Sequence, residues 1–359
     1  MNSIVSDAPS SKVIVGVDTH KHIHVAVAIN QHGTRLGDRA VSADSGGYAQ
    51  LEAWVQELGR VDRFGIEGTG SYGAGLTSYL RRCGHRVVEV NRGDRRSRRN
   101  NGKSDAIDAE AAARSVLAGT STAIPKTADG LVEMIRQVKV ARDTARKGRT
   151  SAIITLKTLI VNAPAELRES LDGLTNRALI DRCARFRVSA MNSPTASAKH
   201  SLRALARRWR HLDTEVRSHD AVLDDLTTQA SPTLRDAYGL GADSAAEFLI
   251  VFGDNPERIR SEAAFAKLCG ACPIPASSGQ TSRHRLYRGG HRQANAALYR
   301  VAIVRMRFHQ PTINYVARRT TEGLTKKDII RCLKRFLARE VYQRVMTDHR
   351  TRQCPAPTP

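Results

Sequence analysis

The chain has 359 residues, of which 41% are hydrophobic, so it is long enough for two or three domains with sizeable cores. Lys and Arg total 57 against 35 Asp and Glu, a formal net charge of +22. This excess favours a polyanionic partner, nucleic acid first and an anionic membrane surface second. We expect a soluble, cytoplasmic protein without membrane contact, because the sequence has neither a run of about 18 apolar residues nor a signal-peptide core.

The N-terminal region alternates apolar runs with helical patterns. KVIVGVD and HIHVAVAIN predict consecutive strands, and a third strand is expected from Thr34 to Val41. A helix from Tyr48 to Leu58, the strand RFGIE, a helix from Ala74 to Cys83 and the strand HRVVEV follow. This order of hairpin, third strand, helix, strand, helix and strand predicts an α/β domain with the RNase H-like fold.

Four carboxylates occupy positions in this region that suit metal-dependent phosphoryl chemistry. Asp18 ends the first apolar run, Glu67 ends RFGIE, and Asp105 and Asp108 fall in KSDAIDAEAAA, which predicts the first turns of a helix. Residues three apart on a helix share a face. Carboxylates that converge from strand ends and a helix form a hard oxygen site suited to Mg²⁺. Two such ions would bind the attacking and leaving oxygens of a phosphodiester.

Two nucleotide-binding motifs offer alternative interpretations. GTGSYG, from Gly68 to Gly73, satisfies the dinucleotide pattern GxGxxG, and Glu89 ends the next strand, where a ribose-binding acid would lie. However, this motif follows two earlier strands and leaves Asp18, Asp105 and Asp108 unexplained. GVDTH resembles the phosphate loop of actin-like and sugar kinases, but the glycine-rich adenosine motifs of those enzymes are missing. A metal site is therefore favoured over both alternatives.

A basic segment precedes the paired aspartates. Residues 81–103 contain nine Lys and Arg and only two acids. A run of arginines is usually a solvated face or a flexible arm, but beside a metal site its cations would hold phosphates. The residues of this segment assigned to nucleic-acid binding are Arg92, Arg95, Arg96, Arg98, Arg99 and Lys103.

The middle of the chain predicts two long helices, the first from about Asp129 to Val161. The second carries a heptad series, namely Leu202, Leu205, Trp209, Leu212, Val216, His219, Leu223 and Leu226. The stretch from Asn162 to Lys199 is predicted to be looped or variably structured. The two helices would form a coiled-coil hairpin or an oligomerisation stalk, or each would cover a core. We predict domains at 1–125, 126–230 and 231–359.

The C-terminal region combines glycine turns with a basic stretch. TLRDAYGLGADSAAEFLIVFGD resembles a helix-hairpin-helix whose Gly239 and Gly241 would admit a phosphate to backbone N–H groups. An ordinary glycine turn explains the same spacing. From Ala263 to Thr321 there is no Asp or Glu, and the arginines are Arg283, Arg285, Arg288, Arg292, Arg300, Arg305, Arg307, Arg318 and Arg319. The first four of these are assigned to nucleic-acid binding.

A serine pair lies within this basic stretch. Ser277 and Ser278 precede Gly279, among cationic groups that could lower the barrier to hydroxyl attack on phosphorus. Taken without context, Ser-Ser-Gly is most simply a loop.

The six cysteines are expected to be reduced thiols. Cys269 and Cys272 have a zinc-like spacing, but His284 and His291 are separated by six residues, outside the usual three to five. Structural zinc is therefore not expected.

Four strings together identify a family resemblance. GVDTHKHIHVAVAI, GIEGTGSYGAGL, GKSDAIDAEAAA and CGACPIPASSGQTSRHRLYRGGHRQANAALY resemble the DEDD transposases of the Insertion Sequence 110 family, over about Val13 to His349. The resemblance implies a RuvC-like N-terminal domain, a coiled coil and a mainly helical C-terminal transposase domain. It places the catalytic, metal-binding acids at Asp18, Glu67, Asp105 and Asp108. It places the nucleophile at Ser278, with Ser277 as the neighbouring alternative.

The resemblance also implies a mechanism and partners. Such enzymes cut and rejoin donor and target DNA through a serine–DNA phosphodiester, with Mg²⁺ or Mn²⁺ as cofactor. A structured guide (bridge) RNA selects the DNA, the protein assembles as a homo-oligomer, either dimer or tetramer, and it acts at the nucleoid in the bacterial cytoplasm. The alternatives are a RuvC-like structure-selective endonuclease without serine chemistry, a non-catalytic nucleic-acid-binding protein and a dinucleotide oxidoreductase.

Overall fold

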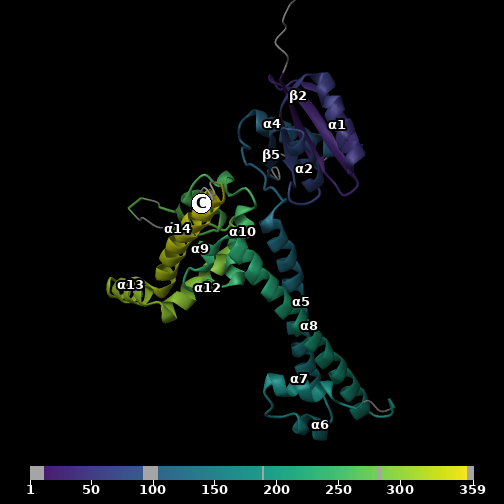
Figure 1. Cartoon of the computed structure of the whole chain (residues 1–359), viewed down its shortest axis with the longest axis vertical. Helices are drawn as coiled ribbons and strands as arrows, with labels where there is room; N and C mark the ends of the chain where they lie inside the picture. Colours follow the sequence, from purple (N-terminus) through teal and green to yellow (C-terminus); the bar gives the residue numbers. More distant parts are fainter. Residues whose placement is uncertain (1–11, 92–103, 188–189, 278, 281–283, 354–359) are drawn as a thin grey trace, which may run out of the picture. The chain divides into compact units, whose positions relative to one another are not determined.

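The computed structural model describes residues 12–91, 104–187, 190–277, 279–280 and 284–353. The chain divides into two compact units, Met1–Ala128 (unit 1) and Asp129–Pro359 (unit 2) (Figure 1). The further domain boundary predicted after residue 230 lies within unit 2.

Unit 1 contains a five-stranded sheet in the order β3-β2-β1-β4-β5. The strands are β1 (Lys12–Thr19), β2 (Ile23–Asn30), β3 (Arg35–Ser42), β4 (Arg60–Glu67) and β5 (Val87–Val90). The first three are antiparallel neighbours, whereas β4 pairs in parallel with both β1 and β5. The helices are α1 (Ser45–Leu58), α2 (Ala74–Arg82) and α4 (Asp105–Leu117). The predicted RNase H-like α/β order is confirmed.

The central strand β1 has helices on both of its faces, which explains why its residues are apolar without alternation. Val13 and Val15 face a core that includes Leu51 of α1 and Leu76 of α2. Ile14, on the opposite face, belongs to a second core built on the alanines of α4. The sheet therefore separates α1 and α2 from α4.

Unit 2 contains two long helices, α5 (Leu131–Val161) and α8 (Pro194–Ala230), which run side by side and form the stalk (Figure 1). The predicted heptad helix thus pairs with a helix of its own chain, as in the coiled-coil hairpin alternative. Ser193 begins α8 by accepting a hydrogen bond from the amide of Ala196, with Pro194 in the first turn.

The prediction of a looped connection between these helices is wrong in part. The connection contains α6 (Ala165–Ser170), α7 (Asn176–Ala184) and the start of α8. Leu167 and Ile180 are buried there against Leu156 and Leu202, forming a separate small core. Because these short helices bury apolar side chains against the stalk, packing stabilises them where local sequence alone would not. We call α6, α7 and the adjoining parts of α5 and α8 the stalk end.

The rest of unit 2 is mainly helical. Its elements are α9 (Pro232–Arg235), α10 (Ala242–Phe252), the short 3₁₀ helix η1 (Pro256–Arg258), α11 (Glu262–Leu268), β6 (Pro273–Pro275), β7 (His284–Leu286), α12 (Arg292–Phe308), α13 (Gln310–Thr321) and α14 (Lys326–Gln353). The largest core of the described residues lies here, where the rings of Phe252 and Phe265 stack with centroids 4.5 Å apart. This packing confirms the predicted helical C-terminal region.

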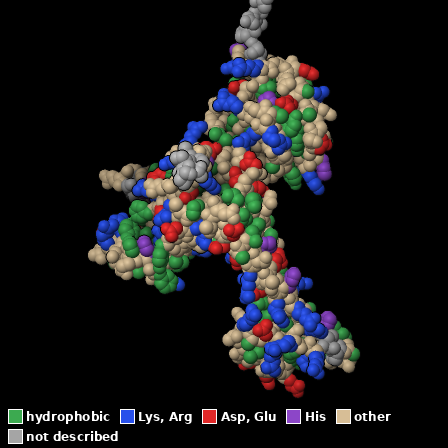
Figure 2. Space-filling model, in the orientation of Figure 1, with side chains coloured by type: hydrophobic (Ala, Val, Ile, Leu, Met, Phe, Trp, Pro, Cys, Tyr) green, Lys and Arg blue, Asp and Glu red, His purple; other side chains and the backbone are tan. Residues whose placement is uncertain are grey.

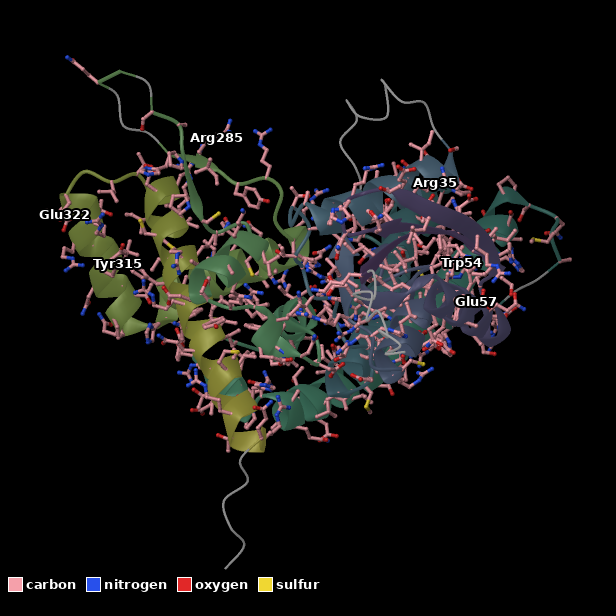
Figure 3. All side chains as sticks on the ribbon, turned by 90° about the horizontal axis from the view of Figure 1, so that it is seen from above. Arg35, Trp54, Glu57, Arg285, Tyr315 and Glu322 are labelled. Atoms are coloured by element: carbon pink, nitrogen blue, oxygen red, sulfur yellow. The ribbon has the colours of Figure 1, made fainter. Side chains whose placement is uncertain are left out.

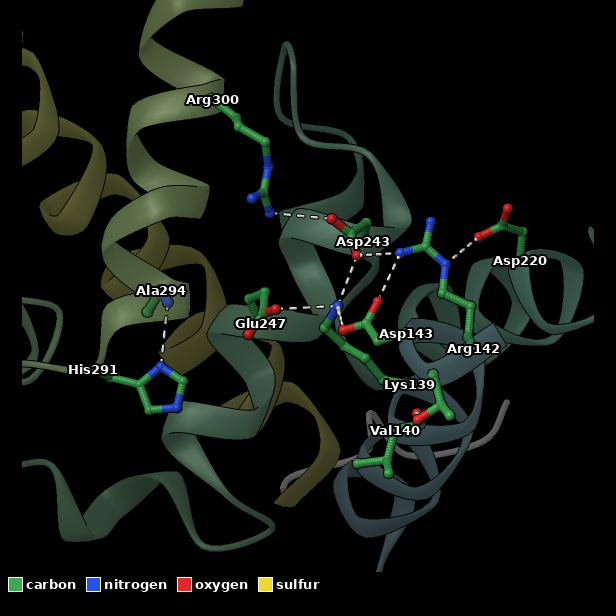
Figure 4. A network of polar contacts seen from close by, with 11 residues as sticks. Lys139, Val140, Arg142, Asp143, Asp220, Asp243, Glu247, His291, Ala294 and Arg300 are labelled. Atoms are coloured by element: carbon green, nitrogen blue, oxygen red, sulfur yellow. Dashed lines mark hydrogen bonds and ion pairs between the residues drawn. The ribbon is translucent and has the colours of Figure 1, made fainter. Parts of the chain in front are cut away.

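An ion-pair network joins the stalk to this helical region (Figure 4). The Lys139 side chain is only 6% exposed, and its Nζ lies 2.7 Å from Asp243 Oδ1 and 3.1 Å from Glu247 Oε1. Arg142 contacts both Asp243 and Asp220. Burial opposes ionisation of Asp243, but its hydrogen bond and charge interaction with Lys139, together with Arg142, hold its pKa below the usual value. These contacts fix α5 against α8 and α10.

Candidate functional site

The carboxyl ends of β1 and β4 bring Asp18 and Glu67 next to each other. The two strands are parallel, with Gly16 opposite Gly65 and the following residues paired in the same register. Continuing this register places Asp18 opposite Glu67 at the same edge of the sheet. The Thr19 hydroxyl also donates a hydrogen bond of 2.8 Å to the Glu67 carbonyl, which holds the two strand ends together.

Two glycines bring α4 close to this edge. A Cβ atom on Gly16 would lie 1.9 Å from the carbonyl oxygen of Ala109, and one on Gly65 would lie 2.6 Å from Cγ2 of Val116. Both glycines therefore face α4 at very close range. Since alternate residues of a strand share a face, the acids two positions later, Asp18 and Glu67, point to the side of the sheet that α4 covers.

The N-terminus of α4 supplies the other two acids. Ser104 caps the helix by accepting a hydrogen bond of 3.3 Å from the amide of Ile107. Asp105 and Asp108 then occupy the first turn, where negative charge interacts favourably with the helix dipole. Asp108 immediately precedes Ala109, the residue that contacts β1. The first turn of α4 therefore lies near the strand ends, and we call Asp18, Glu67, Asp105 and Asp108 the acidic edge.

His20 lies between two of these acids, although the sequence analysis did not single it out. Its Nε2 is 3.2 Å from Asp18 Oδ2 and 3.3 Å from Asp105 Oδ1. Ligand atoms of these three residues all lie within 4.8 Å of one another. Asp18 is 13% exposed, whereas Asp105 is 50% exposed, so the group opens to solvent on the α4 side. The available sequence signal was the position of His20 two residues after Asp18.

The donor chemistry of the acidic edge fits a divalent cation. Two carboxylates this close repel each other unless a positive charge lies between them. In the described residues the His20 imidazole lies between the Asp18 and Asp105 carboxylates. Carboxylate oxygens are the ligands preferred by Mg²⁺ and Mn²⁺, and the partial exposure leaves room for water ligands. Asp18 and Asp105 therefore lie where a cation could bind between them, and metal binding by these two acids and by Glu67 and Asp108 stays a prediction.

Ser277 belongs to a short hairpin in unit 2. β6 and β7 pair antiparallel, with Ile274 opposite Arg285, and Ser277 lies in the connection between them. Ser278 is outside the described residues. Gly279 has φ +57°, a conformation that favours glycine and shapes the turn after the serines. We call residues 273–286 the serine hairpin.

The predicted nucleic-acid-binding residues fall into two groups. Arg285 (labelled in Figure 3), Arg288 and Arg292 are exposed on or just after the serine hairpin. The remaining residues lie outside the described parts of the chain, namely Arg92, Arg95, Arg96, Arg98, Arg99, Lys103 and Arg283.

A further basic surface, which the sequence analysis did not assign, lies at the stalk end. Figure 2 shows Lys and Arg side chains gathered there. Exposed examples are Arg182 and Arg185 near the end of α7 and Arg208 and Arg210 on α8. Its signal in the sequence was the excess of Arg over acids in the connection and the first half of α8.

Two residues of the disfavoured zinc pattern have structural roles. Cys269 lies in the main core of unit 2, and burial raises the pKa of its thiol to about 12. His291 Nδ1 accepts a hydrogen bond of 3.2 Å from the amide of Ala294 and so caps α12.

The glycine turn between α9 and α10 has Gly239 at φ +75° and Gly241 as the α10 N-cap. Asp243 brings its own negative charge to the first turn of that helix. Phosphate binding at this turn stays a prediction.

Comparisons with known proteins agree across both units. A family model for DEDD transposases of the IS110 type matches residues 15–163, and a model described as transposase of the IS116/IS110/IS902 family matches residues 231–317. A search of curated proteins finds no match. The first model spans the acidic edge and the first stalk helix, and the second spans the serine hairpin. No helix in the described residues is both long and apolar enough to cross a membrane.

Proposed function

Because the chain belongs to the IS110 family of DNA transposases, we propose that it moves an insertion sequence by cutting and rejoining DNA through a covalent serine–DNA intermediate. The observation that carries this proposal is the approach of Asp18 and Asp105 to one another at the end of the sheet. DEDD transposases typically bind a divalent metal. Among the described residues, Asp18, His20 and Asp105 form a group that could hold one.

In this proposal Asp18, Glu67, Asp105 and Asp108 hold Mg²⁺ or Mn²⁺. The metal, when bound, supplies Lewis-acid stabilisation of charge on the phosphodiester oxygens. The protein contributes a rigid frame for the four carboxylates, because α4 contacts β1 at backbone distance through Gly16. His20 Nε2 lies 3.2 Å from Asp18 and 3.3 Å from Asp105, so it lies beside the position proposed for the metal.

Ser278 is the proposed nucleophile. Its Oγ forms a bond to phosphorus while the bond from phosphorus to one strand oxygen breaks, and the hydroxyl proton passes to the departing oxygen or to solvent. A hydroxyl of a second DNA end then attacks the serine phosphodiester, which restores the serine and joins the strands. The reaction consumes no nucleotide, because each phosphodiester broken is replaced by another. Arg285 and Arg288 hold the DNA phosphates beside the hairpin.

A structured guide RNA selects donor and target DNA in this proposal, and the protein acts as a homo-oligomer, either dimer or tetramer. The composition supports binding of the protein to the sugar-phosphate backbone of nucleic acid and not to its bases, because the net charge is +22 and aromatic residues make up only 5% of the chain. The basic stalk end provides further backbone-binding surface.

A second candidate is a RuvC-like endonuclease in which water replaces the serine. The acidic edge favours it, because four carboxylates with bound metal can activate water without help from unit 2.

One experiment separates these functions. The purified chain is incubated with Mg²⁺, element-junction DNA and the element's RNA, and SDS-resistant protein–DNA adducts are measured on gels. We expect an adduct that Ser278→Ala abolishes and that Ser277→Ala, the matched neighbour, retains. Cleaved ends without an adduct, unchanged in Ser278→Ala, would establish the nuclease instead. Binding without cleavage by a folded preparation would favour a non-catalytic nucleic-acid-binding protein.

A further inference from the structure

Unit 2 contains a cavity of about 450 Å³ between the serine hairpin and the first turns of α14. On the hairpin side it is lined by Cys272 and Arg285, and on the α14 side by Cys332, Lys334 and Phe336, among others. We call it the hairpin cavity. Its volume lies in the range of about 300–1,000 Å³ that is typical of small-molecule sites.

The hairpin cavity contains one buried cation, Lys334, that has no acidic partner in the described residues. Lys334 is only 8% exposed, and its sole partner among the described residues is the neutral Asn295 amide, whose Oδ1 lies 2.6 Å from Nζ. Arg335 also lines the cavity; its Nη2 pairs with Glu262 at 3.1 Å, whereas its buried Nη1 has no partner in the described residues. Asp328 is the one acid among the lining residues, and Arg331 already pairs with it at 2.6 Å.

Asn295 cannot balance the Lys334 charge. Its Nδ2 donates to the carbonyl of Cys269 at 2.7 Å and to that of Gly270 at 3.0 Å, which fixes the amide and presents Oδ1 to the lysine. An ammonium group has three N–H donors, so two remain without a partner in the described residues. A buried charge without a counter-charge is costly, and burial lowers the Lys334 pKa accordingly. An anion bound in the cavity would remove this cost.

The walls of the cavity add an apolar surface to the cationic one. Phe336 is 50% exposed, and its ring meets that of Tyr315 edge-on with centroids 5.6 Å apart (Tyr315 is labelled in Figure 3). Pro273 and the two cysteines lie on the same lining. A ligand that fits this combination has a negative group at one end and a flat apolar ring at the other. A nucleotide has this chemistry.

We propose that the hairpin cavity binds one nucleotide of a single-stranded segment of the bound nucleic acid, with its phosphate against Lys334 and Arg335 and its base against Phe336. This inference rests on the proposed function, because it takes the nucleic acid as the source of the nucleotide. Lys334 is then a positioning residue, since Asn295 connects it to the carbonyls of Cys269 and Gly270, a few residues before the serine hairpin. Occupancy of the cavity orients the base of the hairpin that carries the serines.

The cysteines of the cavity allow a direct test with the full chain. Cys272 and Cys332 are partly exposed, whereas Cys183 is buried in the stalk end and reports global unfolding. The chain is treated with N-ethylmaleimide with and without a single-stranded DNA oligonucleotide, and labelling of each cysteine is followed by mass spectrometry. At about 90% occupancy we expect labelling of both lining cysteines to slow about tenfold, because they react only when the cavity is empty.

Matched variants give the test its specificity. Lys334→Gln should remove the protection, whereas Lys327→Gln, the same change at an exposed site on α14 outside the cavity lining, should retain it. If N-ethylmaleimide labels Cys183 in Lys334→Gln, that variant is unfolded. Phe336→Ala, at the half-exposed wall of the cavity, then serves as the second variant. Unchanged labelling at saturating oligonucleotide, or protection that survives both cavity variants, would overturn the proposal.

The source of the nucleotide is tested in a separate arm. A deoxynucleoside monophosphate replaces the oligonucleotide, and protection by the free nucleotide but not by the strand would overturn the proposal. The labelling assay needs no catalysis, so its failure is distinguishable from failure of the proposed function. An adduct without protection rejects the hairpin cavity alone, and protection without an adduct rejects the serine mechanism alone.

Discussion

Replacing Gly16 with alanine tests whether contact between α4 and β1 aligns the acidic edge. The added Cβ would lie 1.9 Å from Ala109 O and 2.4 Å from Ala113 N, both backbone atoms that cannot rotate away. The nearer contact must lengthen to about 3.4 Å to become ordinary van der Waals contact, so α4 has to move away from β1 with Asp105 and Asp108. A misplacement of about 1 Å can cost about 10²-fold in rate, and overpacking costs about 1–3 kcal/mol of stability.

The assay compares metal-dependent cleavage of element-junction DNA with thermal unfolding of the same preparations. We expect Gly16→Ala to remain folded at a lowered unfolding temperature and to cleave about 10²-fold more slowly. Gly70→Ala is the control, because a Cβ there meets nothing within 4 Å and its backbone does not have positive φ. If Gly16→Ala matched the wild type in both rate and unfolding temperature, close contact with α4 would not position the acids.

Three further predictions concern stability. Lys139→Met leaves the buried Glu247 carboxylate without its cation, so we expect the free energy of unfolding in urea to fall by about 3–5 kcal/mol. Asp220→Asn, at a half-exposed partner of Arg142, should lower it by less than about 1 kcal/mol, and equal losses would contradict the assigned roles. Burial lowers the His24 pKa, so the unfolded chain takes up a proton more readily and stability should fall as pH drops below about 6.5. His24→Phe should make the free energy of unfolding depend less on pH in this range. If the dependence stayed the same, His24 would not be its source. Leu156→Ala, in the core of the stalk end, should lower the free energy of unfolding by about 2–5 kcal/mol and speed amide hydrogen exchange in α6 and α7. Unchanged exchange rates would show that this core does not stabilise the two helices.

The fold of unit 1 was predictable because its signals are local. β1 and β2 are apolar runs bounded by polar turns, and the predicted helices and strands follow in the observed order. Asp105 and Asp108 were placed on one helix by their spacing alone. Gly16 and Gly65 each precede an acid by two residues, and only the structure reveals that both admit α4 at close range.

The parts that the sequence did not predict depend on contacts between distant segments. α6 and α7 lie in the stretch that was predicted to be looped or variably structured because it contains Pro, Asn and Ser, and their apolar residues are buried against Leu156 and Leu202 of the two stalk helices. His20 lies in a turn, where side-chain periodicity gives no information, and its role follows from contacts with Asp18 and Asp105. The hairpin cavity likewise depends on α14, whose Lys334 reaches Asn295 of α12.

The most direct test of the account is metal rescue at the acidic edge. Asp105→Cys replaces a hard oxygen ligand by a softer sulfur, which binds Mg²⁺ poorly and thiophilic ions better. DNA cleavage by this variant is measured in Mg²⁺ and again in Mn²⁺ supplemented with low Cd²⁺, with Asp105→Ala as the control. We predict that Asp105→Cys is inactive in Mg²⁺ and regains cleavage with the softer ions, whereas Asp105→Ala is not rescued. If Asp105→Cys cleaved DNA in Mg²⁺ as fast as the wild type does, or if the softer ions rescued both variants equally, the assignment of Asp105 as a metal ligand would be contradicted.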